Sequence, residues 1–430
     1  MASLQYRLLF SCAFNFVCLF GISEQTESKY ADKLLLVSMD GFRWDFLYKT
    51  YTPNFDKFIK NGIKVEYVNN SFVTKTFPAH YTIVTGVYEE THGIVSNSMY
   101  DPVFKETFNM RTKTTKWWNA SEPIWCYVKR FNLNSGSYFW PGDDTIINGI
   151  RPNKWLKYAQ ATPFRKRVDD VMDWFTKDNF NFVSLYFHEP DSTGHRHGPE
   201  SPEVNEKVGE MDELLGYLVT KLEEKKLTDK VNVIITSDHG MYPVDVKNKV
   251  VDIYDYVKRS QIQRTPLLGP VAQIQPVDGQ TDAVVDQLRN VPHITVYHKR
   301  DIPDRLHYKH NRRIMSVLVM ADEGWLVTDN KTKLAELEHY KGSHGWDNSL
   351  ISMKPFLVAS GPNFKKNARF GPIESVDIYP LICELMGIPP GPTNGSLDRV
   401  IGFVVPFQVS AAPSVHVPWF LLLLAPTVMS

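Results

Sequence analysis

The sequence predicts an α/β fold in which a largely parallel sheet is covered by helices on both faces and carries an inserted subdomain. Short apolar runs alternate with amphipathic helical patterns along most of the chain. Acidic or imidazole side chains stand directly after several of these runs. The chain has 430 residues, 43% of them hydrophobic, which is enough to bury the core of one large domain.

Four apolar runs are the expected strands of the sheet. They cover residues 34–39, 182–187, 231–236 and 356–360. Because helical patterns separate these runs, we expect the strands to be connected by crossover helices and to lie mainly parallel.

Three helices are expected from their start signals and periodicity. The first follows Thr52, which is the expected cap, with Pro53 at the first helical position. The second begins at Ser201 and continues with apolar residues at helical spacing. The third starts near Asp377. The segment from about 245 to 340 has weaker periodicity, which indicates an inserted subdomain of short strands.

Possible metal ligands follow the expected strands or lie in a glycine-flanked loop. They are Asp40, Asp191, His195, Asp238, His239 and His344. In an open α/β sheet, ligands converge at the carboxyl ends of the strands. Asp and His are donors that Zn²⁺ accepts when no thiolate is present. An isolated pair such as Asp191 and His195 is more typical of a surface hydrogen bond, and His344 alone is more typical of a surface or capping histidine. Six donors in this pattern nevertheless favour a site for two metal ions.

Thr76 is the candidate nucleophile. It stands ahead of Pro78 in a turn that should open a helix, so its hydroxyl can lie at a positive helix end. A threonine hydroxyl is unreactive at neutral pH unless a metal or a base activates it. The alternative is that Thr76 serves only as a helix N-cap, and the residues alone favour neither interpretation.

The two ends of the chain predict a secreted protein tethered to a cell surface. Residues 1–23, with Arg7 ahead of an apolar stretch, are typical of a cleaved signal peptide, although a membrane anchor is the alternative. Residues 401–430 form a linker and a hydrophobic tail. The apolar part, residues 417–429, is short for a span and predicts a lipid-anchor signal or a short membrane tail.

Composition excludes other classes of protein and of site. In the mature chain only Cys126 and Cys383 remain, so at most one disulfide and no thiolate metal site is expected. The 48 basic and 48 acidic residues, without long like-charge runs, argue against a nucleic-acid partner. No obligate protein partner is evident. Four sequons for N-glycosylation also suit a secreted protein. They are at Asn69, Asn119, Asn330 and Asn394.

Six motifs occur in a fixed order between residues 40 and 348. They are DGFRWD, KTFPAHYTIVTG, THGIVSN, EPDSTGH, IITSDHGM and HGWDN. Together they closely resemble the ecto-nucleotide pyrophosphatase/phosphodiesterase family, a branch of the alkaline phosphatase superfamily. The resemblance implies an alkaline-phosphatase-like fold and places the phosphodiesterase catalytic domain at residues 30–400.

The resemblance also implies roles for individual residues. One Zn²⁺ would be held by Asp40, Thr76, Asp238 and His239, and the other by Asp191, His195 and His344. Thr76 would form a phospho-threonine intermediate, with its backbone amide and Asn97 stabilising the developing oxyanion. Because none of these positions is substituted, we expect an active enzyme.

Within the family, the chain is most similar to the short choline-phosphodiesterase or alkaline sphingomyelinase member. The expected reaction is therefore zinc-dependent hydrolysis of choline phospholipids at a membrane surface, with sphingomyelin giving ceramide and phosphocholine. A choline cation binds to aromatic faces. The candidate rings are Phe77, Trp140, Tyr158 and Tyr186.

Two other functions stay open. The same rings would stack a nucleobase equally well, and the KTFPAHY motif is more similar to the nucleotide-cleaving members. The first alternative is therefore an extracellular nucleotide phosphodiesterase or pyrophosphatase. The second is an inactive cell-surface recognition protein.

Overall fold

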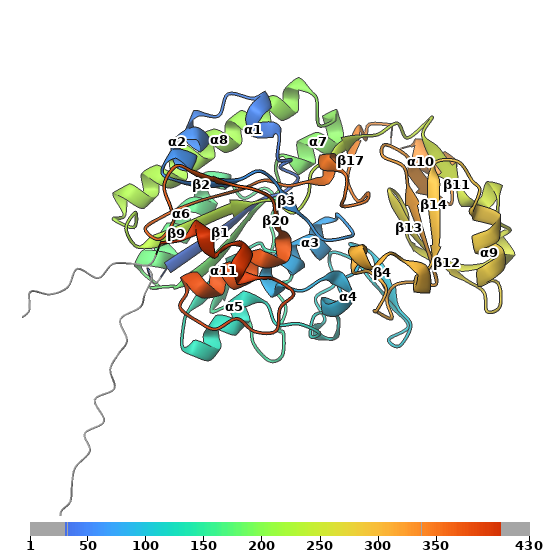
Figure 1. Cartoon of the computed structure of the whole chain (residues 1–430), viewed down its shortest axis with the longest axis horizontal. Coiled ribbons are helices and arrows are strands. Elements are labelled where there is room, and N and C mark those ends of the chain that lie inside the picture. The colour runs from blue at the N-terminus through green and yellow to red at the C-terminus, as the bar shows by residue number, and fades with distance from the viewer. Residues whose placement is uncertain (1–30, 32, 337, 406–430) are drawn as a thin grey trace, which may run out of the picture.

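A computed structural model describes residues 31, 33–336 and 338–405. An eight-stranded sheet lies in the larger lobe, and a four-stranded sheet forms the smaller lobe beside it (Figure 1). Among the described residues, no helix is both long enough and apolar enough to cross a bilayer. The predicted signal peptide and the apolar tail at residues 417–429 lie outside the described residues.

The large sheet is mostly parallel. In spatial order its strands are β19 (Ala368–Phe370), β2 (Gly62–Val65), β18 (Leu357–Ser360), β9 (Val231–Thr236), β1 (Lys33–Met39), β8 (Phe182–Phe187), β6 (Ser135–Tyr138) and β7 (Lys154–Trp155). The central strand β1 pairs in parallel with β8 and β9. Only β18 runs antiparallel to its neighbours. The predicted largely parallel sheet is confirmed.

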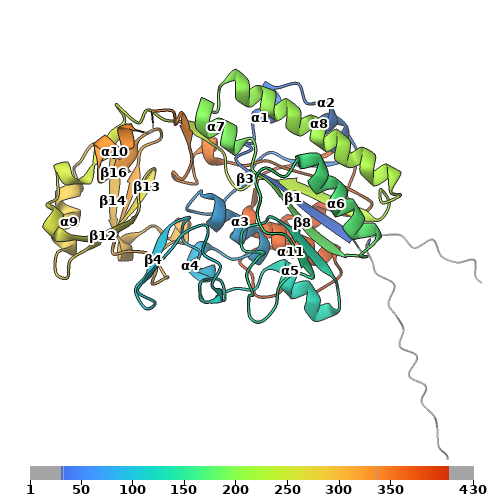
Figure 2. The same cartoon turned by 180° about the vertical axis from the view of Figure 1, so that it is seen from behind.

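Helices cover both faces of this sheet (Figures 1 and 2). One face carries α2 (Pro53–Lys60), α6 (Phe164–Thr176) and α8 (Pro202–Glu224). The other carries α3 (Thr76–Thr85), α5 (Ile124–Tyr127) and α11 (Ile378–Leu385). Side chains of β1 alternate between the two cores: Leu35 and Val37 pack with the first group, and Leu34 and Leu36 with the second.

Short elements complete the larger lobe. They are α1 (Phe46–Lys49), α4 (Glu89–His92), α7 (Asp191–His197), and the strand pairs β3 (Val68–Asn69) with β20 (Ile373–Glu374) and β4 (Met99–Asp101) with β5 (Glu106–Phe108).

The smaller lobe is the predicted inserted subdomain. Its antiparallel sheet has the order β12 (Ile262–Leu267), β13 (Val271–Pro276), β15 (Val317–Ala321), β14 (Ile294–His298). The lobe also contains β11 (Val250–Asp252), α9 (Thr281–Leu288), β16 (Leu326–Thr328) and α10 (Lys331–Ala335). It has its own hydrophobic core. Where the chain leaves and rejoins the larger lobe, β10 (Tyr242–Pro243) pairs with β17 (Gly342–Ser343).

All three expected helices form, but one cap differs from the prediction. Ser201 caps α8 by accepting a hydrogen bond from the backbone N–H of Val204. Thr52 precedes α2 but makes no capping hydrogen bond. The buried carboxylate of Asp212, on α8, instead accepts from the backbone N–H groups of Asn54 (3.2 Å) and Phe55 (2.8 Å). The expected Thr52 cap is therefore wrong, because a side chain from a neighbouring helix satisfies these donors.

The two cysteines among the described residues are free thiols. Cys126 and Cys383 are buried, and burial raises the pKa of each thiol to about 12. They do not form the one disulfide that the sequence allowed.

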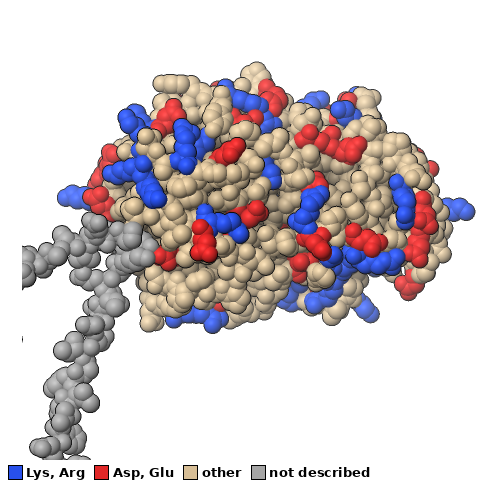
Figure 3. Space-filling view, viewed as in Figure 1, with Lys and Arg blue, Asp and Glu red and all other residues tan. Residues whose placement is uncertain are grey.

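Sequon asparagines and charged side chains of both signs lie at the surface of the described residues. Three sequon asparagines are exposed, namely Asn119, Asn330 and Asn394. The fourth, Asn69, is half-buried and donates from Nδ2 to Glu374. On the face shown in Figure 3, positive and negative side chains are interspersed, as the balanced composition of the chain suggests.

We predict that Asp212→Ala lowers the free energy of unfolding by about 1–3 kcal/mol, because it leaves two N–H groups of α2 without their acceptor. Urea unfolding measures the change. Glu213→Ala, at the next and exposed position of α8, is the matched control and should change stability by less than about 0.5 kcal/mol. Equal effects of the two substitutions would contradict the capping role.

Candidate metal centre and active site

The structure brings all six predicted acidic and imidazole donors together. They form two groups, Asp40 with Asp238 and His239, and Asp191 with His195 and His344. In each group the candidate ligand atoms all lie within 4.8 Å of one another. Because β1, β8 and β9 are adjacent and parallel, their carboxyl ends deliver most of these residues to one edge of the sheet.

Close contact between two loops makes this convergence possible. The backbone N–H of Asp191 donates to the carbonyl of Asp40 at 3.0 Å. Gly41 lies between them with φ of +68°, and a Cβ there would stand 2.8 Å from the Cβ of Asp191. A side chain at position 41 would therefore push apart the loops that carry Asp40 and Asp191.

The three histidines are oriented as ligands. Each is hydrogen-bonded through Nδ1 to a backbone carbonyl, which only accepts, so Nδ1 carries a proton and Nε2 is the nitrogen that a metal would bind. The acceptors are Gly342 for His195 (2.7 Å), Gly240 for His239 (2.9 Å) and Thr74 for His344 (2.8 Å). The Nε2 atoms face carboxylates: His239 Nε2 is 3.0 Å from Asp238 Oδ2, and His195 Nε2 is 3.3 Å from Asp191 Oδ2.

The carboxylates in these groups repel one another. Burial and the carboxylates of Asp238 and Asp191 raise the pKa of Asp40 well above its usual value. Burial is also the main cause that raises the pKa of Asp191 to about 7. Burial opposes ionisation of Asp238 as well, but His239 and His80 hold its pKa well below the usual value.

Four buried atoms of the two groups have no hydrogen-bond partner among the described residues. They are Asp40 Oδ1, Asp191 Oδ1, Asp238 Oδ2 and His239 Nε2. Burial lowers the pKa of His195 to about 3 and also holds the pKa of His344 well below its usual value, so both imidazoles are neutral and ready to bind a metal. Buried acceptors without a hydrogen-bond partner and closely spaced carboxylates raise the free energy of the folded state unless cations bind to them. The residues therefore fit metal ions in both groups.

The two groups are neighbours. The rings of His239 and His344, one from each group, stack with centroids 3.5 Å apart. Ions held by the two groups would therefore act on the same bound substrate, as in two-metal hydrolases.

Thr76 is the first residue of α3, where the N-terminal N–H groups of the helix give a positive end. Lys75, not Thr76, occupies the N-cap position, so the structure rules out the alternative that Thr76 is only a cap. Asn97 accepts from the backbone N–H of Phe77 at 2.8 Å through Oδ1. This bond leaves the Nδ2 hydrogens of Asn97 for an anionic oxygen beside the start of the helix.

The sequence interpretation missed His80. One turn after Thr76, its Nδ1 lies 2.8 Å from the Thr76 carbonyl and 3.3 Å from Asp238 Oδ2. Its Nε2 lies 2.7 Å from Ser38 Oγ. His80 therefore connects α3 to one of the two donor groups. Its position four residues after Thr76 was the available signal.

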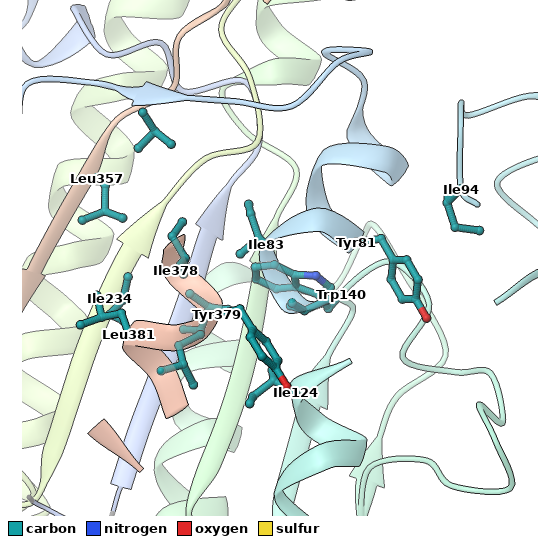
Figure 4. Packing of buried hydrophobic residues seen from close by; sticks show 14 of the residues in the cluster. Tyr81, Ile83, Ile94, Ile124, Trp140, Ile234, Leu357, Ile378, Tyr379 and Leu381 are labelled. Carbon is teal, nitrogen blue, oxygen red and sulfur yellow. The ribbon is translucent and has the colours of Figure 1, made fainter. Parts of the chain in front are cut away.

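Two of the four expected substrate-binding rings lie elsewhere. Trp140 is 1% exposed, donates from Nε1 to the His80 carbonyl, and packs in the core with Ile83 of α3 (Figure 4). Tyr186 is buried, and its hydroxyl donates to Asp40 Oδ2 at 2.6 Å, so it orients a candidate metal ligand. Trp140 and Tyr186 therefore do not present their faces to a substrate as expected.

The other two expected rings are accessible. Tyr158 is 45% exposed and Phe77 is half-buried.

The side chain of Lys75 places a positive charge beside the candidate metal centre. Lys75 Nζ donates to the carbonyl of His344 at 2.5 Å, and burial lowers the pKa of Lys75 to about 8.

Comparisons with known proteins agree with this architecture. Residues 34–347 match the family model described as type I phosphodiesterase / nucleotide pyrophosphatase. The chain is 43% identical to bis(5'-adenosyl)-triphosphatase enpp4 of Xenopus laevis over 380 residues, which are 87% of this chain and 82% of that protein. It is 40% identical to human ectonucleotide pyrophosphatase/phosphodiesterase family member 5 over 390 residues, which are 88% of this chain and 80% of that protein.

A solved structure of murine family member 5 superimposes with a TM-score of 0.83 at 41% identity and covers 87% of this chain and 100% of that one. The fold and the sequence match define an alkaline-phosphatase-like phosphoric diester hydrolase. The chain belongs to the ectonucleotide pyrophosphatase/phosphodiesterase family. These relatives fit the expected short member, but they do not support the choline-phosphodiesterase assignment and instead favour the nucleotide alternative.

We predict that Tyr186→Phe weakens metal binding by roughly 10- to 100-fold, because Asp40 loses the hydroxyl that orients it. Competition with a fluorescent zinc chelator measures the affinity. Tyr217→Phe is the matched control, because that hydroxyl also donates to an aspartate at 2.6 Å but at an exposed site. Equal affinities of the two variants would contradict the orienting role.

Removal of divalent cations should make stability strongly pH-dependent. In the metal-free fold the pKa of Asp191 rises from 3.8 to about 7, mainly by burial. The pKa of His239, which burial alone would lower, rises from 6.5 to about 9 because of Asp238 and its neighbours. The side chains of Asp191 and His239 both bind a proton more tightly in the folded than in the unfolded chain. Proton binding therefore stabilises the fold at low pH, and this stabilisation is lost as pH rises through the two pKa values.

The melting temperature of the chelator-treated protein should therefore fall between pH 6 and pH 9. Saturating zinc should raise the melting temperature and flatten this slope, because cations replace the protons. The same slope with and without zinc would contradict a metal centre at these residues.

Proposed function

We propose that the chain hydrolyses a phosphodiester or phosphoanhydride bond of an extracellular nucleotide and releases a nucleoside monophosphate, with Thr76 as nucleophile and two Zn²⁺ ions as cofactors. The observation that carries this proposal is the position of Thr76. It opens α3 beside both donor groups, since His80 joins its carbonyl to Asp238 and His344 bonds to Thr74, two residues earlier.

The chain's own residues suit a two-step transfer. Thr76 Oγ bonds to phosphorus and loses its proton to solvent, while the bond from phosphorus to the leaving oxygen breaks and that oxygen is protonated. Water then attacks the same phosphorus and loses a proton to solvent, while the bond from phosphorus to Thr76 Oγ breaks and Oγ is protonated again. Asn97 Nδ2 and the N–H groups at the start of α3 are donors for the developing negative charge. When bound, zinc ions supply positive charge that lowers the pKa of a hydroxyl and polarises the phosphate.

The nucleotide is favoured over the choline lipid by the rings and the charge at the site. A choline cage needs several aromatic faces around one cation, but Trp140 is in the core and the Tyr186 hydroxyl is bonded to Asp40. The positive charge of Lys75 would also repel a quaternary ammonium. Phe77 and Tyr158 remain accessible and could stack a flat nucleobase.

Relatives support the same choice. One is named bis(5'-adenosyl)-triphosphatase. A structure of murine family member 5, inactivated by a single threonine-to-alanine substitution, contains AMP. Extracellular relatives and three exposed sequons also suit a protein of the secretory pathway. A tether through residues 417–429 stays a prediction from the sequence.

The test compares rates on bis(5'-adenosyl) triphosphate and on sphingomyelin, each with and without a zinc chelator. We expect chelator-sensitive release of AMP and little release of phosphocholine. Thr76→Ala should lower kcat by roughly 10³-fold or more, while Thr76→Ser should retain part of the activity. Metal content, measured by elemental analysis, should stay near two ions per chain in Thr76→Ser.

Three results would count against the proposal. Preferential release of phosphocholine would restore the choline-lipid function. A Thr76→Ala variant as fast as the wild type would exclude Thr76 as nucleophile. No turnover of either substrate would favour the inactive recognition protein.

A further inference from the structure

A short segment of the smaller lobe contacts the loop that carries Asn97. Residues 308–313 lie between β14 and β15 and reach α4 and the residues after it. The backbone N–H groups of Lys309 and His310 both donate to Glu90 Oε2 at 2.8 Å. Arg313 donates to the Gly93 carbonyl at 2.5 Å. The loop from α4 to Asn97 is therefore held from the side of the inserted subdomain.

Tyr308 makes the contact nearest to Asn97. Its hydroxyl donates to the carbonyl of Val95 at 2.5 Å, two residues before Asn97. Tyr308 and Val95 are both fully buried. In a water-free environment such a bond fixes the peptide position, because breaking it leaves a buried carbonyl without a partner.

The direction of this hydrogen bond is determined by Gln273, on β13. Gln273 Oε1 accepts from the backbone N–H of Met315 at 3.0 Å, so Nε2 is the end that faces Tyr308. Gln273 Nε2 donates to the Tyr308 hydroxyl oxygen at 2.6 Å. The single hydroxyl hydrogen of Tyr308 must then point to Val95. A buried chain of hydrogen bonds thus runs from the core of the smaller lobe to the Asn97 loop.

The ring of Tyr308 touches the other half of the active site. It packs edge-on against Phe72, with ring centroids 5.0 Å apart. Phe72 belongs to the segment that leads to Thr76 and that binds His344 through the Thr74 carbonyl. One side chain of the inserted subdomain therefore contacts both the loop before Thr76 and the loop before Asn97.

We propose that Tyr308 is a positioning residue, through which the inserted subdomain sets the place of Asn97 relative to Thr76. The inference rests on the proposed role of Asn97 as an oxyanion donor. The Tyr308 hydroxyl bonds to Val95 and not to a candidate metal ligand, so this hydrogen bond acts on the transition state through Asn97, while the ring contact with Phe72 is kept in Tyr308→Phe. A shift of about 1 Å in a catalytic group can cost on the order of 100-fold in rate.

The experiment is a double-mutant cycle in the full chain with bis(5'-adenosyl) triphosphate as substrate. Tyr308→Phe should lower kcat by roughly 10- to 100-fold, with KM and zinc content nearly unchanged. Asn97→Ala should lower kcat by roughly 100-fold or more. In the Asn97→Ala background, Tyr308→Phe should change kcat by less than about 2-fold, because the residue through which it acts is gone.

Two further variants separate positioning from general destabilisation. Tyr256→Phe, at an exposed tyrosine of the same lobe, is the matched control and should leave kcat unchanged. Gln273→Met removes the donor that orients the Tyr308 hydroxyl and should give a smaller loss of kcat that also disappears without Asn97. If Tyr308→Phe does not fold, the Gln273→Met cycle decides the question.

The outcomes distinguish this inference from the proposed function. If Asn97→Ala lowers kcat but Tyr308→Phe lowers it equally in both backgrounds, the positioning role is overturned and the proposed reaction stands. If Asn97→Ala has no effect, both the oxyanion role of Asn97 and the inference fail, while the Thr76 variants still test the nucleophile.

Discussion

The crowding of three carboxylates at the carboxyl ends of parallel strands is the constraint on which the rest of the structure depends. Asp40, Asp191 and Asp238 are held together although their charges repel. Packing on both faces of the sheet keeps their strands side by side, and the Gly41 contact lets the loops approach. The apolar core thus maintains a cluster of negative charge that cations can then stabilise.

The parts of the fold and site that the sequence predicts are those with local signals. Each strand is an apolar run, and the donors after it converge once the sheet is parallel. The start of α8 follows from Ser201 and a helical repeat. Residue type and position along the chain were sufficient for these features.

The sequence could not predict partners that come from distant parts of the chain. The sequence shows that Tyr186 and Trp140 are aromatic but not where their side chains lie. Only the packed structure shows that Tyr186 orients Asp40 and that Trp140 lies in the core. The cap of α2 comes from Asp212, far along the chain on α8. These contacts depend on which helices and strands pack against each other. No local pattern in a single sequence shows that packing.

The inserted lobe is joined to the candidate metal centre at both of its ends. His239 lies shortly before β10 and His344 shortly after β17, and these two strands pair. The stacked rings of the two histidines therefore close a loop of about 100 residues. Closing so long a loop is entropically unfavourable, so ions held by the two groups would also stabilise the junction of the two lobes.

The order of strands has a consequence for synthesis of the chain on the ribosome. Among the strands of the described residues, β2 pairs only with β18 and β19, which follow it by about 290 to 300 residues. At translation rates of about 5–20 residues per second, both edges of β2 wait on the order of 15 to 60 s for their partners. During this interval the nascent chain presents an unpaired apolar strand, the kind of edge that chaperones shield from aggregation.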